Sequence, residues 1–148
     1  MRVLYMTGEN IVKPCLRWAG GKNWLIKYLP QIMRDITFDN YHEPFLGGAS
    51  VFLSIKPSQQ AFLSDLNEDL IKTYIALRDY PYDIIKVLCT YSNDKDSYYK
   101  IRSEHPQDEV TRAARFIYLN QTSFNGIYRV NLKAVSYTHL RAHETRED

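Results

Sequence analysis

The sequence predicts an α/β protein with a partial Rossmann-like sheet that is interrupted by a run of helices. A short apolar segment leads through Tyr41 into a Gly-rich turn and then a helix, in the stretch Glu43-Pro44-Phe45-Leu46-Gly47-Gly48-Ala49-Ser50. A second apolar run, residues 61–64, ends at Asp65. From residue 67 onward the periodicity is mainly helical. Strand, helix, strand and then several helices is the order expected of a sheet with a helical insertion.

The Gly-rich turn and Asp65 together have the layout of a dinucleotide or adenosyl site. Glycines let the backbone approach a ligand closely, and an acid about 20 residues further on accepts hydrogen bonds from ribose hydroxyls. We therefore expect a nucleotide-like ligand at this turn. The alternative from the residues alone is an ordinary strand-to-helix turn with a turn-capping aspartate.

The remaining elements follow from hydrophobic spacing and capping residues. One helical face is expected at Leu25, Ile26 and Leu29, ended by Pro30, and residues 61–64 are expected to form a buried strand. Asn67 is a suitable N-cap for the next helix, and Pro81 suits the first turn of another. Further helices are expected over residues 98–103 and 107–121, before a turn at 125–126.

Composition places the chain among ordinary globular proteins. It has 148 residues, a net charge of +2 and 45% hydrophobic residues, which suits one domain with a real core. No apolar run approaches the ~20 residues that cross a bilayer, and the start has no signal-peptide pattern. Cys15 and Cys89 are far apart and are expected to be reduced thiols. We expect no membrane and no metal partner, and a cytoplasmic location.

The last residues, 134–148, have a different character from the rest. They show neither helical nor strand periodicity. Read back into codons, residues 135–144 resemble the mosaic end of a transposase-based sequencing adapter. We therefore expect residues 134–148 to be a non-native tail, in which His139 and His143 have no role. The protein would then be residues 1–133, with the chain broken off near Lys133.

Two loops carry side chains suited to chemistry. The first runs Arg17-Trp18-Ala19-Gly20-Gly21-Lys22. An indole face can pack on a sulfonium or an adenine, and an ammonium can pair with a carboxylate. Glu43 could accept from an amino group of the same ligand, or serve only as a local acceptor. The alternative for Trp18 and Lys22 is a helix entry with a buried indole and a solvated lysine.

The second loop, residues 124–131, combines an aromatic residue, an amide and a guanidinium around a tight turn. Arginine reads guanine with two hydrogen bonds, and asparagine can contact adenine or phosphate. An apolar side chain there could wedge into a base step. The alternative is an exposed hairpin tip.

With these motifs in hand, the chain resembles the DNA adenine-N6 methyltransferases of the Dam type, in the alpha-class motif order. The resemblance covers roughly residues 13–133 and rests on four ordered motifs: Leu16-Arg17-Trp18-Ala19-Gly20-Gly21-Lys22, Glu43 to Phe52, Ser64-Asp65-Leu66-Asn67, and Tyr118-Leu119-Asn120 running on to Phe124-Asn125-Gly126 and Asn131. Ala49 departs from a family turn that is usually richer in glycine.

The resemblance implies S-adenosyl-L-methionine as cofactor and double-stranded DNA as substrate. Its cofactor-binding positions correspond to Trp18, Lys22, Glu43, Phe45, Gly47 and Asp65, and its DNA-contacting hairpin to Phe124, Asn125, Ile127 and Arg129. It implies a cofactor-binding segment over 1–66 and a helical target-recognition segment over 67–133. A cognate restriction endonuclease could share the system without direct contact, and the protein would associate with the nucleoid through DNA.

The family's catalytic Asp-Pro-Pro-Tyr motif does not occur in this sequence. The nearest stretch, Asp79-Tyr80-Pro81-Tyr82, joins two predicted helices and is a poor substitute. We therefore expect a methyltransferase sheet truncated before its remaining strands, no assignable catalytic residue and no turnover by this chain. Two other classes stay open: a non-catalytic DNA-binding module and a fragment of a Rossmann-type oxidoreductase.

Overall fold

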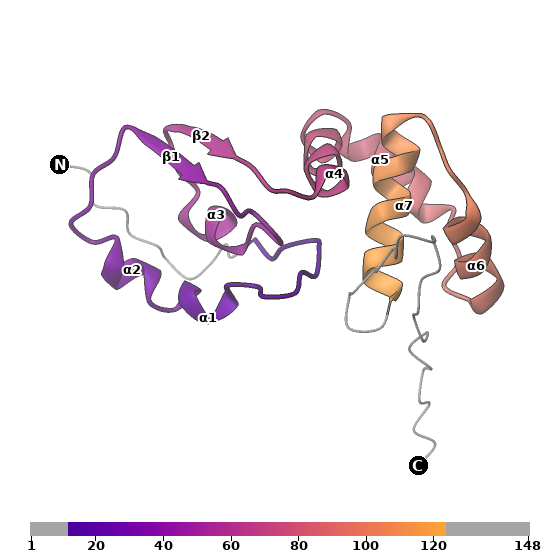
Figure 1. Ribbon diagram of the computed structural model, residues 1–148, viewed down its shortest axis with the longest axis horizontal. Helices are drawn as coiled ribbons and strands as arrows, with labels where there is room; N and C mark the ends of the chain where they lie inside the picture. The colour runs from indigo at the N-terminus through magenta and orange to yellow at the C-terminus, as the bar shows by residue number, and fades with distance from the viewer. Residues whose placement is uncertain (1–11, 124–148) are drawn as a thin grey trace, which may run out of the picture. The chain divides into compact units, whose positions relative to one another are not determined.

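The computed structural model describes residues 12–123, which fall into two compact units divided between Glu68 and Asp69. The first unit contains both strands of the described region, and the second is helical (Figure 1). The predicted division into a cofactor-binding and a target-recognition segment after residue 66 stays a prediction. The structure thus has the mixed helix and strand content predicted, with a parallel sheet of two strands in the described part.

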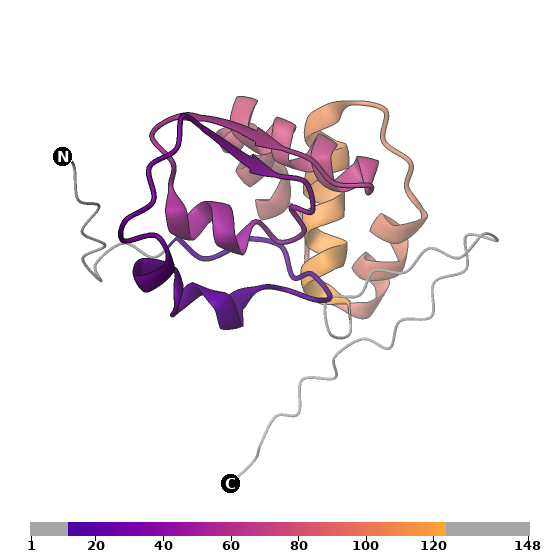
Figure 2. The ribbon, with the colours of Figure 1, turned by 60° about the vertical axis from the view of Figure 1, so that its left-hand side comes forward.

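The first unit is built around a strand-helix-strand segment. Strand β1 (Asn40–Glu43) pairs in parallel with β2 (Gln60–Leu63), in a register that sets Glu43 opposite Leu63. Helix α3 (Ser50–Ile55) connects the two strands (Figure 2). These positions confirm the predicted strand into Glu43, the helix that follows the Gly-rich turn and a second strand before Asp65.

The core of this unit lies on one face of the sheet. Buried Leu29, Val51 and Ile55 pack with Leu25, Met33, Phe38 and Tyr41. Successive side chains of a strand alternate between faces, so Tyr41 turns toward α3 while His42 lies on the other face. There the His42 ring stacks on that of Phe62, with centroids 4.7 Å apart.

Two local predictions for this unit were wrong. Pro30 does not end a helix: α1 (Asn23–Ile26) is followed by α2 (Leu29–Ile32), which has Pro30 in its first turn. A first-turn N–H has no partner within its helix, so proline costs nothing there. The second strand is also not buried, since Phe62 is 45% exposed. On the face away from α3, both Gln60 and Phe62 are exposed.

The second unit consists of α4 (Glu68–Asp79), α5 (Pro81–Cys89), α6 (Lys95–Ser103) and α7 (Glu109–Thr122). Pro81 is the first residue of α5, as predicted. Helix α6 begins earlier than predicted because the Asp94 carboxylate accepts from the Ser97 N–H at 2.8 Å. The core around α6 and α7 is formed by Tyr98, Ile101, Tyr118 and Leu119.

Candidate functional site

The turn after β1 is tied to the chain that follows β2. The Ser64 N–H donates to the carbonyl of Glu43, and the Leu46 N–H donates to the carbonyl of Ser64, both at 3.0 Å. These bonds continue the parallel pairing past the ends of the strands. They fix the start of the Gly-rich turn against the residue that precedes Asp65.

Asp65 closes this arrangement with both carboxylate oxygens. Its Oδ2 accepts from the Gly47 N–H and its Oδ1 from the Asn67 N–H, each at 2.9 Å. An ionised carboxylate has about four lone-pair sites, so each oxygen can accept one further hydrogen bond. Asp65 therefore holds the turn in place and still has acceptor capacity for a ligand with hydroxyl groups.

Gly47 provides the contact between the turn and Trp18. It has a φ of +51°, a conformation that favours glycine, and a Cβ at this position would lie 2.8 Å from Cδ1 of the indole. Cβ atoms essentially never come this close to another atom, so any other residue would force Trp18 or the turn to move. Because Trp18 belongs to the loop of residues 17–22, this loop is brought to the Gly-rich turn.

Lys22 makes the second link between the same loop and the turn. Its Nζ donates to the carbonyl oxygen of Phe45 at 2.6 Å and lies 3.8 Å from Oε1 of Glu43. Phe45 is 68% exposed, and it takes part in this contact through its backbone carbonyl. All six residues predicted from the resemblance to bind the cofactor are thus gathered around one turn: Trp18, Lys22, Glu43, Phe45, Gly47 and Asp65.

Glu43 is the buried charge of this group, with 6% exposure. Oε2 accepts from the Tyr41 hydroxyl at 2.7 Å, while buried Oε1 has no hydrogen-bond partner among the described residues. Burial, the hydrogen bond to Glu43 and its charge all raise the pKa of Tyr41. Tyr41 was not predicted as a site residue. Its two-residue spacing from Glu43 puts both on one strand face, and this was the available signal.

Ala49, which departs from the usual family turn, has a left-handed backbone with φ 58° and ψ 22°. A residue other than glycine costs about 1–3 kcal/mol in this region. The side chain is 2% exposed, so its methyl group is packed in return. The substitution therefore keeps the turn at some conformational cost.

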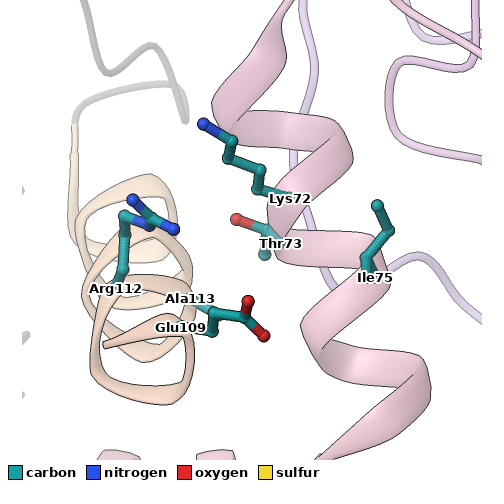
Figure 3. Close-up of a pocket in the computed structure, with 6 residues that line it drawn as sticks. All are labelled: Lys72, Thr73, Ile75, Glu109, Arg112 and Ala113. Atoms are coloured by element: carbon teal, nitrogen blue, oxygen red, sulfur yellow. The ribbon is translucent and has the colours of Figure 1, made fainter. Parts of the chain in front are cut away.

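A separate pocket of about 130 Å³ lies between α4 and α7 in the helical unit. Lys72, Thr73 and Ile75 line it from α4, and Glu109, Arg112 and Ala113 line it from α7 (Figure 3). The Thr73 hydroxyl donates to the Asp69 carbonyl at 2.7 Å within its own helix. No residue predicted for the cofactor or DNA lies in this pocket.

The predicted DNA-contacting residues Phe124, Asn125, Ile127 and Arg129 lie outside the described residues, as does the predicted tail. Within residues 12–123, no group of three or more His, Cys, Asp or Glu side chains is arranged to hold a metal ion. No helix in the same range is long and apolar enough to cross a membrane.

The geometry of the first unit is that of a recognisable class of α/β proteins. Parallel strands joined by a helix, with a Gly-rich turn after the first and an acid after the second, are typical of α/β proteins that bind nucleotide-like ligands. The family model of the D12 class N6 adenine-specific DNA methyltransferases matches residues 18–145. The chain belongs to this family, and the predicted resemblance is confirmed. The match includes residues 134–145, and the origin of segment 134–148 stays a prediction.

Relatives agree with the family match. The chain is 35% identical over 141 residues to a type II methyltransferase of Lactococcus lactis subsp. cremoris, covering 90% of the chain and 49% of the relative. It is 34% identical over 143 residues to one of Methanocaldococcus jannaschii, covering 82% and 50%. It is 38% identical over 125 residues to the DNA adenine methylase of Salmonella typhi, covering 80% and 44%. The chain spans about half the length of these relatives.

Proposed function

We propose that this chain supplies the methyl-donor site and the target-recognition helices of an enzyme that methylates adenine at N6 in double-stranded DNA. The methyl donor is S-adenosyl-L-methionine. The observation that carries the proposal is the convergence of Trp18 and Lys22, from one loop, and of Asp65, from the chain after β2, on the turn from Glu43 to Gly48. Membership of the D12 class supports the reaction.

The donor site is assigned residue by residue from chemistry. Asp65 accepts from the ribose hydroxyls with the lone pairs not used by Gly47 and Asn67. Trp18 presents an indole face to the sulfonium or the adenine. Lys22 pairs with the carboxylate of the amino-acid end, and Glu43 accepts from its amino group. When bound, the donor supplies an electrophilic methyl group on a positively charged sulfur.

The charges of Lys22 and Glu43 suit a zwitterionic ligand. Their ammonium nitrogen and carboxylate oxygen lie 3.8 Å apart, beyond hydrogen-bond distance, with the lysine held by the Phe45 carbonyl instead. An ammonium has three donors, so Lys22 can keep this bond and still contact a ligand carboxylate. Lys22 can therefore still bind the carboxylate of an amino acid, and Glu43 can still bind its ammonium group.

DNA recognition is assigned to residues 67–133. Phe124, Asn125, Ile127 and Arg129 would contact the duplex, with Arg129 reading a base edge. The target adenine would be turned out of the helix before methyl transfer, as enzymes that modify bases require. A restriction endonuclease acting at the same sequence would not need to touch this protein. Its substrate would place the protein on the nucleoid in the cytoplasm.

The proposal assigns binding, and not methyl transfer itself, to the residues of this chain. An Asp-Pro-Pro-Tyr motif would hold the target amine and stack on the extruded base, and the sequence does not contain one. We therefore propose that the 148 residues alone do not turn over. Sequencing the gene past codon 133 in unamplified source DNA tests whether the enzyme to which this segment belongs carries that motif. An Asp-Pro-Pro-Tyr codon run downstream supports the proposal, and an open frame without one contradicts it.

Calorimetric titration of the chain with S-adenosyl-L-methionine and with NAD tests the cofactor. The proposal expects saturable binding of the methyl donor and none of NAD. Binding of NAD alone would favour a Rossmann-type oxidoreductase. If the chain binds duplex DNA but binds neither S-adenosyl-L-methionine nor NAD, a non-catalytic DNA-binding module would be favoured.

A further inference from the structure

Glu43 has an asymmetric environment that the family motif does not explain. Its main chain is fixed, because its carbonyl accepts from the Ser64 N–H at 3.0 Å and its position in β1 is paired with Leu63. Its side chain is fixed through one oxygen only, since Oε2 accepts from the Tyr41 hydroxyl at 2.7 Å. The other oxygen, Oε1, is buried without a hydrogen bond from any described residue.

An acceptor in this state is costly. A buried polar atom without a hydrogen-bond partner destabilises the fold, and the cost is larger when the atom is charged. Lys22 is the nearby cation, but its Nζ remains 3.8 Å from Oε1 and donates to the Phe45 carbonyl at 2.6 Å. Folding therefore leaves Oε1 for a donor that is not part of the described chain.

Tyr41 is placed to keep the carboxylate in this orientation. Its ring is anchored among the aromatic side chains of the unit, with centroids 6.4 Å from Phe38 and 6.2 Å from Phe52. Because the ring is anchored, its hydroxyl stays in place. The hydrogen bond to Oε2 therefore restrains rotation of the Glu43 carboxylate. The hydrogen bond thus determines which oxygen remains to meet a ligand.

We propose that Tyr41 is a positioning residue of the methyl-donor site, which holds Oε2 of Glu43 so that Oε1 accepts from the α-ammonium group of the donor. The inference rests on the proposed function and deepens it. It assigns the ammonium to one atom of Glu43 and gives a role to a residue outside the family motifs.

The test compares three ligands that differ at the amino-acid end. S-adenosyl-L-methionine has both charged groups, its decarboxylated form keeps the ammonium, and 5′-methylthioadenosine has neither. Tyr41→Phe keeps the ring and removes only the hydroxyl. We expect it to weaken the first two ligands by about 3- to 10-fold, in line with the net contribution of one ordinary hydrogen bond, because Tyr41 acts on the ligand only through Glu43. Binding of 5′-methylthioadenosine should not change.

Two further variants make the result specific. Glu43→Gln should weaken the two ammonium ligands by about tenfold or more, and adding Tyr41→Phe to it should have little further effect, because both changes act on one contact. Tyr28→Phe is the matched control, since Tyr28 is 47% exposed and lies outside the turn. Thermal unfolding of each variant reports its fold.

The outcomes separate this inference from the function on which it rests. If the unaltered chain binds none of the three ligands, the proposed function is contradicted and this inference fails with it. If it binds all three and Tyr41→Phe weakens them equally, Tyr41 has only a structural role and the inference alone is overturned. Unchanged binding of the two ammonium ligands would overturn it in the same way.

Discussion

The main-chain N–H of Gly47 donates to Oδ2 of Asp65 at 2.9 Å, although the two residues are 18 positions apart in the sequence. This bond joins the turn after the first strand to the end of the second. Asp65 is therefore both the support of the turn and the candidate ribose acceptor. A ligand that donates a hydrogen bond to Asp65 would therefore also affect the conformation of the glycine turn.

Asp65→Ala should weaken binding of S-adenosyl-L-methionine by about 2–3 kcal/mol, because it removes an ionised acceptor of ribose hydroxyls. Calorimetry on the variant measures this, and Asp35→Ala is the control, since Asp35 is an exposed acid of the same unit. An analogue of the methyl donor that lacks the ribose hydroxyls should bind the unaltered chain and the Asp65→Ala variant equally. If Asp65→Ala weakens that analogue as strongly, Asp65 acts through the turn and not through the ribose.

Gly47→Ala should destabilise the first unit more than Gly20→Ala. Both glycines have a positive φ, +51° and +74°, so alanine costs about 1–2 kcal/mol at either position. Only at Gly47 does the added Cβ meet an atom at 2.8 Å, on Trp18, while nothing lies within 4 Å at Gly20. Urea unfolding of the two variants measures the difference, and equal losses would show that the Trp18 contact yields without cost.

Arg115→Lys should destabilise the helical unit by about 1–3 kcal/mol, because a lysine cannot reproduce two hydrogen bonds from a planar fork. Arg115 donates from Nε to the Ile101 carbonyl at 2.8 Å and from Nη2 to the Arg102 carbonyl at 2.6 Å, at the end of α6. Arg112→Lys on the same helix is the control. Amide exchange should become faster in α6. Protection equal to that of the control would contradict this role.

Stability of the helical unit should fall in acid through the caps of α6 and α7. The pKa of Asp108 is lowered because its carboxylate accepts from the Thr111 backbone N–H, and Asp94 is lowered by Ser97 in the same way. A carboxylate whose pKa is lower in the folded state than in the unfolded state stabilises the fold. This stabilisation is complete at pH values above the pKa of the unfolded state, about 4, and it is lost as the pH falls through the pKa of the folded state.

The double variant Asp94→Asn with Asp108→Asn should flatten this acid dependence, since asparagine caps a helix without titrating. Thermal unfolding followed by circular dichroism between pH 7 and pH 2.5 measures it. Asp108→Ala should instead cost about 1 kcal/mol at neutral pH, because the cap itself is removed. An unchanged pH profile in the double variant would assign the acid sensitivity to other carboxylates.

Local patterns were sufficient for most elements of the fold. The helices after Pro81 and Asp108 and the strand into Glu43 depend on capping and spacing within a few residues, and they appear where predicted. Pro30 was misplaced because proline both ends helices and begins them. The exposure of Phe62 could not be predicted, because it depends on what covers the second face of the sheet.

The sequence by itself determined the family and predicted the six candidate cofactor residues, because the order and spacing of the motifs are properties of the chain. Only the tertiary structure decided how these residues meet. Lys22 contacts the backbone of Phe45, Trp18 lies where a Cβ at Gly47 would meet it, and Tyr41 donates to one oxygen of Glu43. Such contacts depend on the distances between separate segments and on which face of a strand is buried. Neither property can be predicted from neighbouring residues in the sequence.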